Sequence, residues 1–115
     1  MLGHIVVSRN GVLKLLGEAP IWNEEEAAPY NTGSEPITGP EDPHHPLEKI
    51  MTALETSQGQ ILAALERISQ DDLNKKSTDD QTVADRLTGL YWHEAYHVGQ
   101  TDYLHQLAGK NDKVI

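Results

Sequence analysis

Apolar side chains recur at three- and four-residue steps in two long segments of the chain, which is the pattern of an amphipathic helix. Between residues 46 and 69 the apolar positions are Leu47, Ile50, Met51, Leu54, Ile61, Leu65 and Ile68. Between residues 80 and 107 the inward positions are Val83, Leu87, Leu90, His97, Val98, Thr101 and Leu104. We predict one helix from about Pro46 to Ser69 and another from about Asp80 or Thr82 to Leu107, with Gly109 as the stop.

A third helix is predicted over residues 2–16, where apolar residues cover most of the helical circumference. They are Leu2, Ile5, Val6, Val7, Val12, Leu13, Leu15 and Leu16. A helix that is apolar nearly all round is expected to be largely buried, and Gly17 suits its C-terminal cap. No segment alternates convincingly as a strand would, so the predicted fold class is all-α, with residues 1–115 as a single domain of three helices.

The segment 18–45 interrupts the helical pattern. All six prolines lie between Pro20 and Pro46, and no Lys or Arg occurs between Lys14 and Lys49. Proline removes a backbone donor and clashes with the preceding helical turn, which excludes a long helix here. We predict a long acidic loop that Trp22 and Tyr30 anchor to the body of the protein. The polar stretch 70–80 is predicted to be a second connection.

Composition narrows the possible functions. The chain has 115 residues, 18 acidic against nine basic, with a formal charge of −9. Such a chain is not attracted to nucleic acid or to anionic membranes, so we expect neither partner. The absence of cysteine excludes disulfides, thiolate-bound metals and a cysteine nucleophile. Neither a signal-peptide pattern nor a membrane-spanning apolar run is present, and a cytoplasmic location is expected.

The strongest candidate for a functional site is the segment Tyr-Trp-His-Glu-Ala-Tyr-His-Val-Gly-Gln, residues 91–100. His93 and His97 are four residues apart, which places them on one face of a helix, where both imidazoles can reach one divalent metal. Chance pairing on a partly exposed helix is the alternative. Glu94 also points inward, and an inward carboxylate is costly without a partner or a raised pKa.

The same five residues match the zinc-protease motif His-Glu-x-x-His. That interpretation needs a third ligand downstream, but no Glu follows Glu94. The extended form needs Gly and His where this chain has Gln100 and Tyr103. A zinc protease is therefore the less favoured interpretation.

The string His-Glu-Ala-Tyr-His-Val-Gly-Gln, followed by an amphipathic stretch that ends in Leu-Ala-Gly, resembles the last helix of the DinB-like superfamily. Its members are four-helix bundles with a three-histidine metal site. The opening Gly-His-Ile-Val-Val-Ser-Arg-Asn-Gly resembles the family's second helix. The Pro-rich crossover and the helix near 47–68 stand in the expected order. The resemblance implies an up-down bundle that here lacks the family's first helix.

Carried over residue by residue, the resemblance implies metal ligation by His4, His93 and His97. His4 lies off the centre of its apolar stripe, so periodicity alone would not select it. Other candidates for third ligand are His44, His45, Asp102 and His105. His44 and His45 are expected to be solvated, and His105 is turned away from His97 on the helix. Asp102 is better suited to accept a hydrogen bond from an imidazole N–H than to bind the metal. Zn²⁺ or Ni²⁺ is the expected ion.

The function expected from these observations is that of a divalent-metal-binding helical bundle. The resemblance implies an enzyme of the thiol S-transferase or hydrolase type that acts on a small-molecule thiol or another small substrate. By analogy with other metal sites, either Glu94 or a metal-bound hydroxide would act as the base. The alternative is a non-enzymatic bundle that acts through a partner. Three helices cannot enclose each other's apolar faces as four can. A shortened sequence is one explanation, and a homodimer with the first helix near its interface is our prediction.

Overall fold

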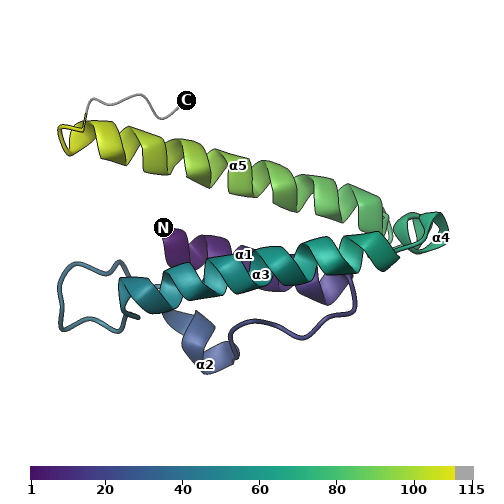
Figure 1. Cartoon of the computed structure of the whole chain (residues 1–115), viewed down its shortest axis with the longest axis horizontal. Helices are drawn as coiled ribbons and strands as arrows, with labels where there is room; N and C mark the ends of the chain where they lie inside the picture. The colour runs from purple at the N-terminus through teal and green to yellow at the C-terminus, as the bar shows by residue number, and fades with distance from the viewer. Residues whose placement is uncertain (111–115) are drawn as a thin grey trace.

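The computed structural model describes residues 1–110, and these form an α-helical bundle. Three long helices, α1 (Leu2–Leu15), α3 (Leu47–Arg67) and α5 (Val83–Leu107), make up its body. As Figure 1 shows, α1 and α3 run in the same direction and α5 runs back against them. Because two consecutive parallel helices cannot be joined by a tight turn, the long crossover after α1 is a consequence of this arrangement. The all-α prediction is confirmed.

The ends of the long helices agree with their predicted caps. Gly17 and Gly109 have positive φ values of 78° and 81°, and each directly follows a helix C-cap residue. In both caps three backbone N–H groups, those of the C-cap residue and of the two residues after it, donate back into the end of the helix. These bonds satisfy carbonyl groups that the helix leaves open. Thr82 is the N-cap of α5 and exchanges hydrogen bonds with Asp85.

Two short helices occupy segments that were predicted to be loops. In the acidic crossover, α2 (Glu24–Ala27) is followed by the 3-10 turn η1 (Ala28–Tyr30), and Asn23 caps α2. In the stretch predicted as a polar connection, α4 (Gln70–Asn74) begins at the N-cap residue Ser69. The second long helix therefore ends at Arg67 and not at Ser69. The reciprocal hydrogen bonds between Ser69 and Asp72 start a new helix in place of prolonging the old one.

The crossover is anchored as predicted. The Trp22 and Tyr30 rings are buried, 5.5 Å apart, against α1 and the start of α3. His45 was expected to be solvated, but it is half-buried with its ring beside both aromatics. Its backbone N–H donates to the Tyr30 hydroxyl at 2.6 Å, which explains why the prediction was wrong. His44 is exposed, as expected.

The α1 helix packs on both α3 and α5, and these two helices hardly touch each other directly. Only a narrow face of α5 is therefore covered. Val98 and Leu104, predicted to point inward, are 52% and 50% exposed. Leu47, Met51 and Leu65 of the predicted α3 stripe are also exposed. The homodimer stays a prediction, and the exposed apolar side chains that favour it lie on α3 and α5.

A groove between α3 and α5 has a volume of about 670 Å³ and is lined mainly by apolar side chains. Arg9 and Glu94 are polar residues in this lining. Within residues 1–110, no helix is both long and apolar enough to cross a lipid bilayer.

The Arg9 side chain links all three long helices. Its Nη2 donates to Glu94 Oε1 of α5 at 2.6 Å, and its Nε lies 3.2 and 3.1 Å from the two carboxylate oxygens. Its Nη1 donates to the Leu54 carbonyl of α3 at 2.8 Å and to the Ser57 hydroxyl at 3.1 Å. Ser57 is completely buried, so this end of the guanidinium lies against the protein interior. Arg9 therefore sets the positions of α3 and α5 relative to α1.

We expect Arg9→Gln to lower the free energy of unfolding by about 2–3 kcal/mol, because it removes charged hydrogen bonds to two neighbouring helices. Arg67→Gln is the matched control, since its ion pair with Glu18 joins exposed side chains and should contribute less than about 1 kcal/mol. Urea unfolding followed by circular dichroism measures both changes. Equal losses in the two variants would contradict the central role of Arg9.

Candidate metal centre

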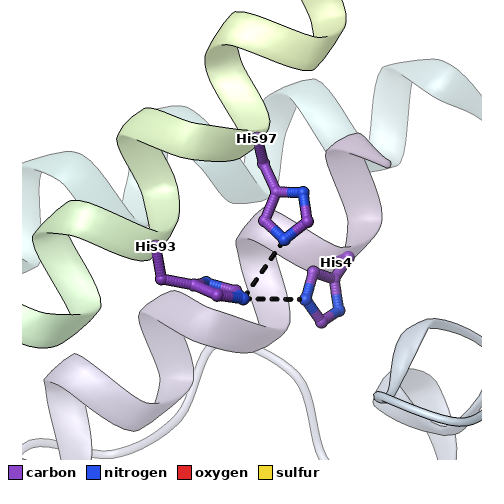
Figure 2. A group of neighbouring side chains, drawn as sticks. All are labelled: His4, His93 and His97. Carbon is purple, nitrogen blue, oxygen red and sulfur yellow. Dashed lines mark hydrogen bonds between the residues drawn. The ribbon is translucent and has the colours of Figure 1, made fainter.

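Three histidines from two helices meet in the structure. His4 lies in the first turn of α1, and His93 and His97 lie one turn apart near the middle of α5. Figure 2 shows the three rings converging, with one nitrogen of each directed toward the others. His93 Nε2 lies 3.1 Å from His97 Nε2 and 3.3 Å from His4 Nε2. All three side chains are half-buried.

The second nitrogen of each ring is occupied by a protein partner. His4 Nδ1 lies 2.8 Å from the Tyr30 carbonyl, and His97 Nδ1 lies 2.7 Å from Gln100 Oε1. Both partners only accept, so each of these Nδ1 atoms carries the ring proton.

His93 Nδ1 lies 3.2 Å from the Ser8 hydroxyl. The Ser8 proton is already donated to the His4 carbonyl at 3.0 Å, so the Ser8 oxygen accepts from His93 Nδ1. The Nδ1 atom of His93 therefore also carries its ring proton in the neutral form.

The three Nε2 atoms consequently present lone pairs to one another. Three acceptors at these separations repel unless a proton or a cation lies between them. Ligand atoms held tetrahedrally at 2.0–2.1 Å from zinc lie about 3.3 Å apart, close to the two observed separations. Hydrogen bonding of the opposite ring nitrogen is the usual support of a metal-bound imidazole. The donor set therefore fits a divalent metal ion.

The alternative third ligands lie elsewhere. Among residues 1–110, the only group of three or more His, Asp or Glu side chains arranged to hold a metal is His4, His93 and His97. His44, His45, Asp102 and His105 are not members of this group. Asp102 was considered as the acceptor for an imidazole N–H. In the structure Gln100 Oε1, and not Asp102, accepts the hydrogen bond from the His97 imidazole. The Oδ2 atom of Asp102 accepts from the Gln106 side chain.

The Glu94 carboxylate forms an ion pair with Arg9, and both of its oxygens accept hydrogen bonds from the Arg9 side chain. The negative charge of Glu94 still acts on the neighbouring His93. A role for Glu94 as a base stays a prediction. The zinc-protease interpretation loses support, because this motif requires its glutamate beside the metal and a third ligand downstream, whereas here His4 lies upstream.

Burial lowers the pKa of the His93 imidazole below its usual value, and positive charge on His97 or His4 lowers it further. The charge of Glu94 opposes this shift in the His93 pKa. The neutral form of His93, which is the form that binds metals, is therefore favoured at neutral pH.

Comparison with known protein families assigns the chain to one of them. Residues 1–101 match the family model of the DinB superfamily, so the chain belongs to that superfamily. Searches of curated proteins and of solved structures found no match.

The lowered pKa of His93 predicts how the stability of the metal-free protein depends on pH. An unfolded histidine has a pKa near 6.5, so between that value and the lower folded-state pKa, unfolding takes up a proton. The stability that depends on neutral His93 is complete above about pH 6.5 and is lost as the pH falls toward the folded-state pKa. Urea unfolding of the metal-free protein from pH 7.5 to 5 measures this loss.

In this experiment the free energy of unfolding of His93→Gln should fall less steeply with decreasing pH than that of the wild type. The variant His44→Gln, which changes an exposed loop residue, should show the same pH dependence as the wild type. Identical pH profiles for the wild type and His93→Gln would contradict the prediction.

Proposed function

We propose that this protein binds one divalent metal ion, Zn²⁺ or Ni²⁺, through Nε2 of His4, His93 and His97. The observation that carries the proposal is the convergence of three Nε2 lone pairs whose Nδ1 partners are already fixed. Imidazole nitrogen suits both ions, and the chain offers no thiolate that would favour a softer metal.

We propose further that the bound ion serves a metal-dependent enzyme of the thiol S-transferase or hydrolase type. A divalent ion lowers the pKa of a thiol or of water and supplies a nucleophile at neutral pH. Three protein ligands leave a position at the metal for a substrate. Membership of the DinB superfamily supports a metal-binding bundle but does not select the reaction.

The residues around the histidines would hold this site in a constant geometry. Tyr30, Ser8 and Gln100 fix the tautomer and the orientation of the three rings. The Tyr30 carbonyl belongs to the crossover, whose aromatic anchor is buried, so the partner of His4 comes from a well-packed segment. A cavity beside His4 and His93 gives a small substrate room to approach.

We expect His4→Ala, His93→Ala and His97→Ala each to weaken Zn²⁺ binding more than about 100-fold, since loss of a ligand exceeds the 10–100-fold effect of losing a supporting hydrogen bond. Gln100→Leu should fall within that smaller range. His44→Ala, in an exposed loop position, is the matched control and should bind as the wild type does. Competition with a chromophoric chelator at pH 7.5 measures the affinities.

Unchanged binding in His4→Ala would overturn the three-histidine site. The enzymatic part is tested separately, by following the consumption of small thiols in the presence of electrophilic acceptors with the metal-loaded protein. Turnover that is lost in the three alanine variants and kept in His44→Ala supports the transferase. A metal-loaded wild type that accelerates neither thiol transfer nor ester hydrolysis would contradict the enzymatic assignment.

A further inference from the structure

A cavity next to the histidines lies between α1, the crossover and the first half of α5. Its volume is about 410 Å³, and His4, Ser8 and His93 form one end of its lining. Val7 and Leu90 add apolar surface. This cavity is separate from the groove between α3 and α5, because no residue other than Leu90 lines both.

Arg86 is the cation in the lining of this cavity. It is half-buried, and within residues 1–110 it takes part in none of the ion pairs, which involve Arg9, Lys49, Arg67 and Lys75. A half-buried guanidinium with five N–H donors and no carboxylate partner is suited to bind an anion.

The position of Arg86 relates it directly to the metal centre. Arg86 precedes His93 by seven residues, which places the two on nearly the same face of α5 and about 10.5 Å apart along the helix axis. Both residues line the same cavity, so a ligand that extends along the cavity can contact both of them.

The other charged group in the lining is Asp85. Its Oδ2 accepts from the Thr82 backbone N–H and from the Thr82 hydroxyl, both at 2.9 Å. These bonds hold the Asp85 carboxylate at the start of α5, where it caps the helix. Because the chain carries a net charge of −9, it does not attract anions in general. Any binding of an anion here depends on Arg86 itself.

Gly89 lies between Arg86 and His93 along α5 and lines the same cavity. A Cβ atom at Gly89 would meet no other atom within 4 Å. The helix would accept a larger residue without a clash, so the absent side chain leaves the space between Arg86 and the histidines open.

We propose that this cavity binds a short organic anion, with its carboxylate or similar group on Arg86 and its other end at His4 and His93. Contact of that other end with a metal rests on the proposed function, whereas binding of the anionic end by Arg86 does not. The ligand class is a small molecule with a negatively charged group at one end and a group able to contact the histidine end at the other.

The experiment compares two three-carbon thiols of similar length, 3-mercaptopropionate, which ends in a carboxylate, and 3-mercapto-1-propanol, which ends in an uncharged hydroxyl group. Each is titrated into Co²⁺-loaded protein, and binding is followed by the absorption of the thiolate–cobalt contact. We expect 3-mercaptopropionate to bind about 10-fold or more tightly, because a charged hydrogen bond is involved. Arg86→Gln should abolish the difference between the thiols. Arg67→Gln, which removes an exposed arginine elsewhere, should preserve it.

Gly89→Leu tests the cavity itself. It should block both thiols while leaving the Co²⁺ spectrum of the thiol-free protein unchanged. Gly59→Leu is the matched control, because a Cβ atom at Gly59 would also meet nothing within 4 Å and Gly59 lies on α3, away from the cavity. Equal affinity of the two thiols for the wild type, or no effect of Arg86→Gln on the difference, would overturn the proposal.

A readout on the metal-free protein separates this proposal from the proposed function. We expect 3-mercaptopropionate to shift the NMR resonance of the Arg86 Nε–H, and 3-mercapto-1-propanol to leave it in place. If Co²⁺ does not bind but this shift occurs, the metal assignment fails and the anion site stands. If Co²⁺ binds and the Arg86 resonance does not move, the anion site fails alone.

Discussion

The contact of α1 with both α3 and α5 is the constraint on which the rest of the structure depends. The two outer helices hardly touch each other, so their relative position is set through the helix between them. Arg9 supplies the polar part of this contact, with Glu94 on one side and Leu54 and Ser57 on the other. Because Glu94 lies in the same stretch of α5 as His93 and His97, the ion pair also fixes where these histidines stand relative to His4.

The crossover contributes to the same site from the other side of α1. The Tyr30 carbonyl accepts from His4, while the Tyr30 ring packs closely over Gly3. A Cβ atom at Gly3 would overlap the ring carbons of Tyr30, so this approach of the crossover to α1 requires glycine. A long acidic segment with a buried aromatic anchor thereby orients a residue of the candidate metal centre, so the most irregular part of the chain contributes to the candidate site.

Much of the fold follows from periodicity and cap residues, and the site follows only in part. His93 and His97 are identifiable from spacing alone, since one helix carries both. His4 required the family resemblance, because its place beside them depends on how two helices pack. The ion pair of Glu94 with Arg9 and the supporting roles of Ser8 and Gln100 depend on helix rotation, which periodicity does not resolve. The short helices had local signals, in the capping pairs Asn23–Glu26 and Ser69–Asp72.

The central claim is that three Nε2 atoms from two helices bind one metal ion. X-ray absorption spectroscopy of the Zn²⁺-loaded protein at pH 7.5 tests it most directly, because the scattering pattern distinguishes imidazole from carboxylate ligands and counts the rings. The account predicts three imidazole nitrogens at about 2.0–2.1 Å from the metal, with one imidazole lost in the His4→Gln variant. A first shell made only of oxygen atoms, or one with two imidazoles that is unchanged in His4→Gln, would contradict it.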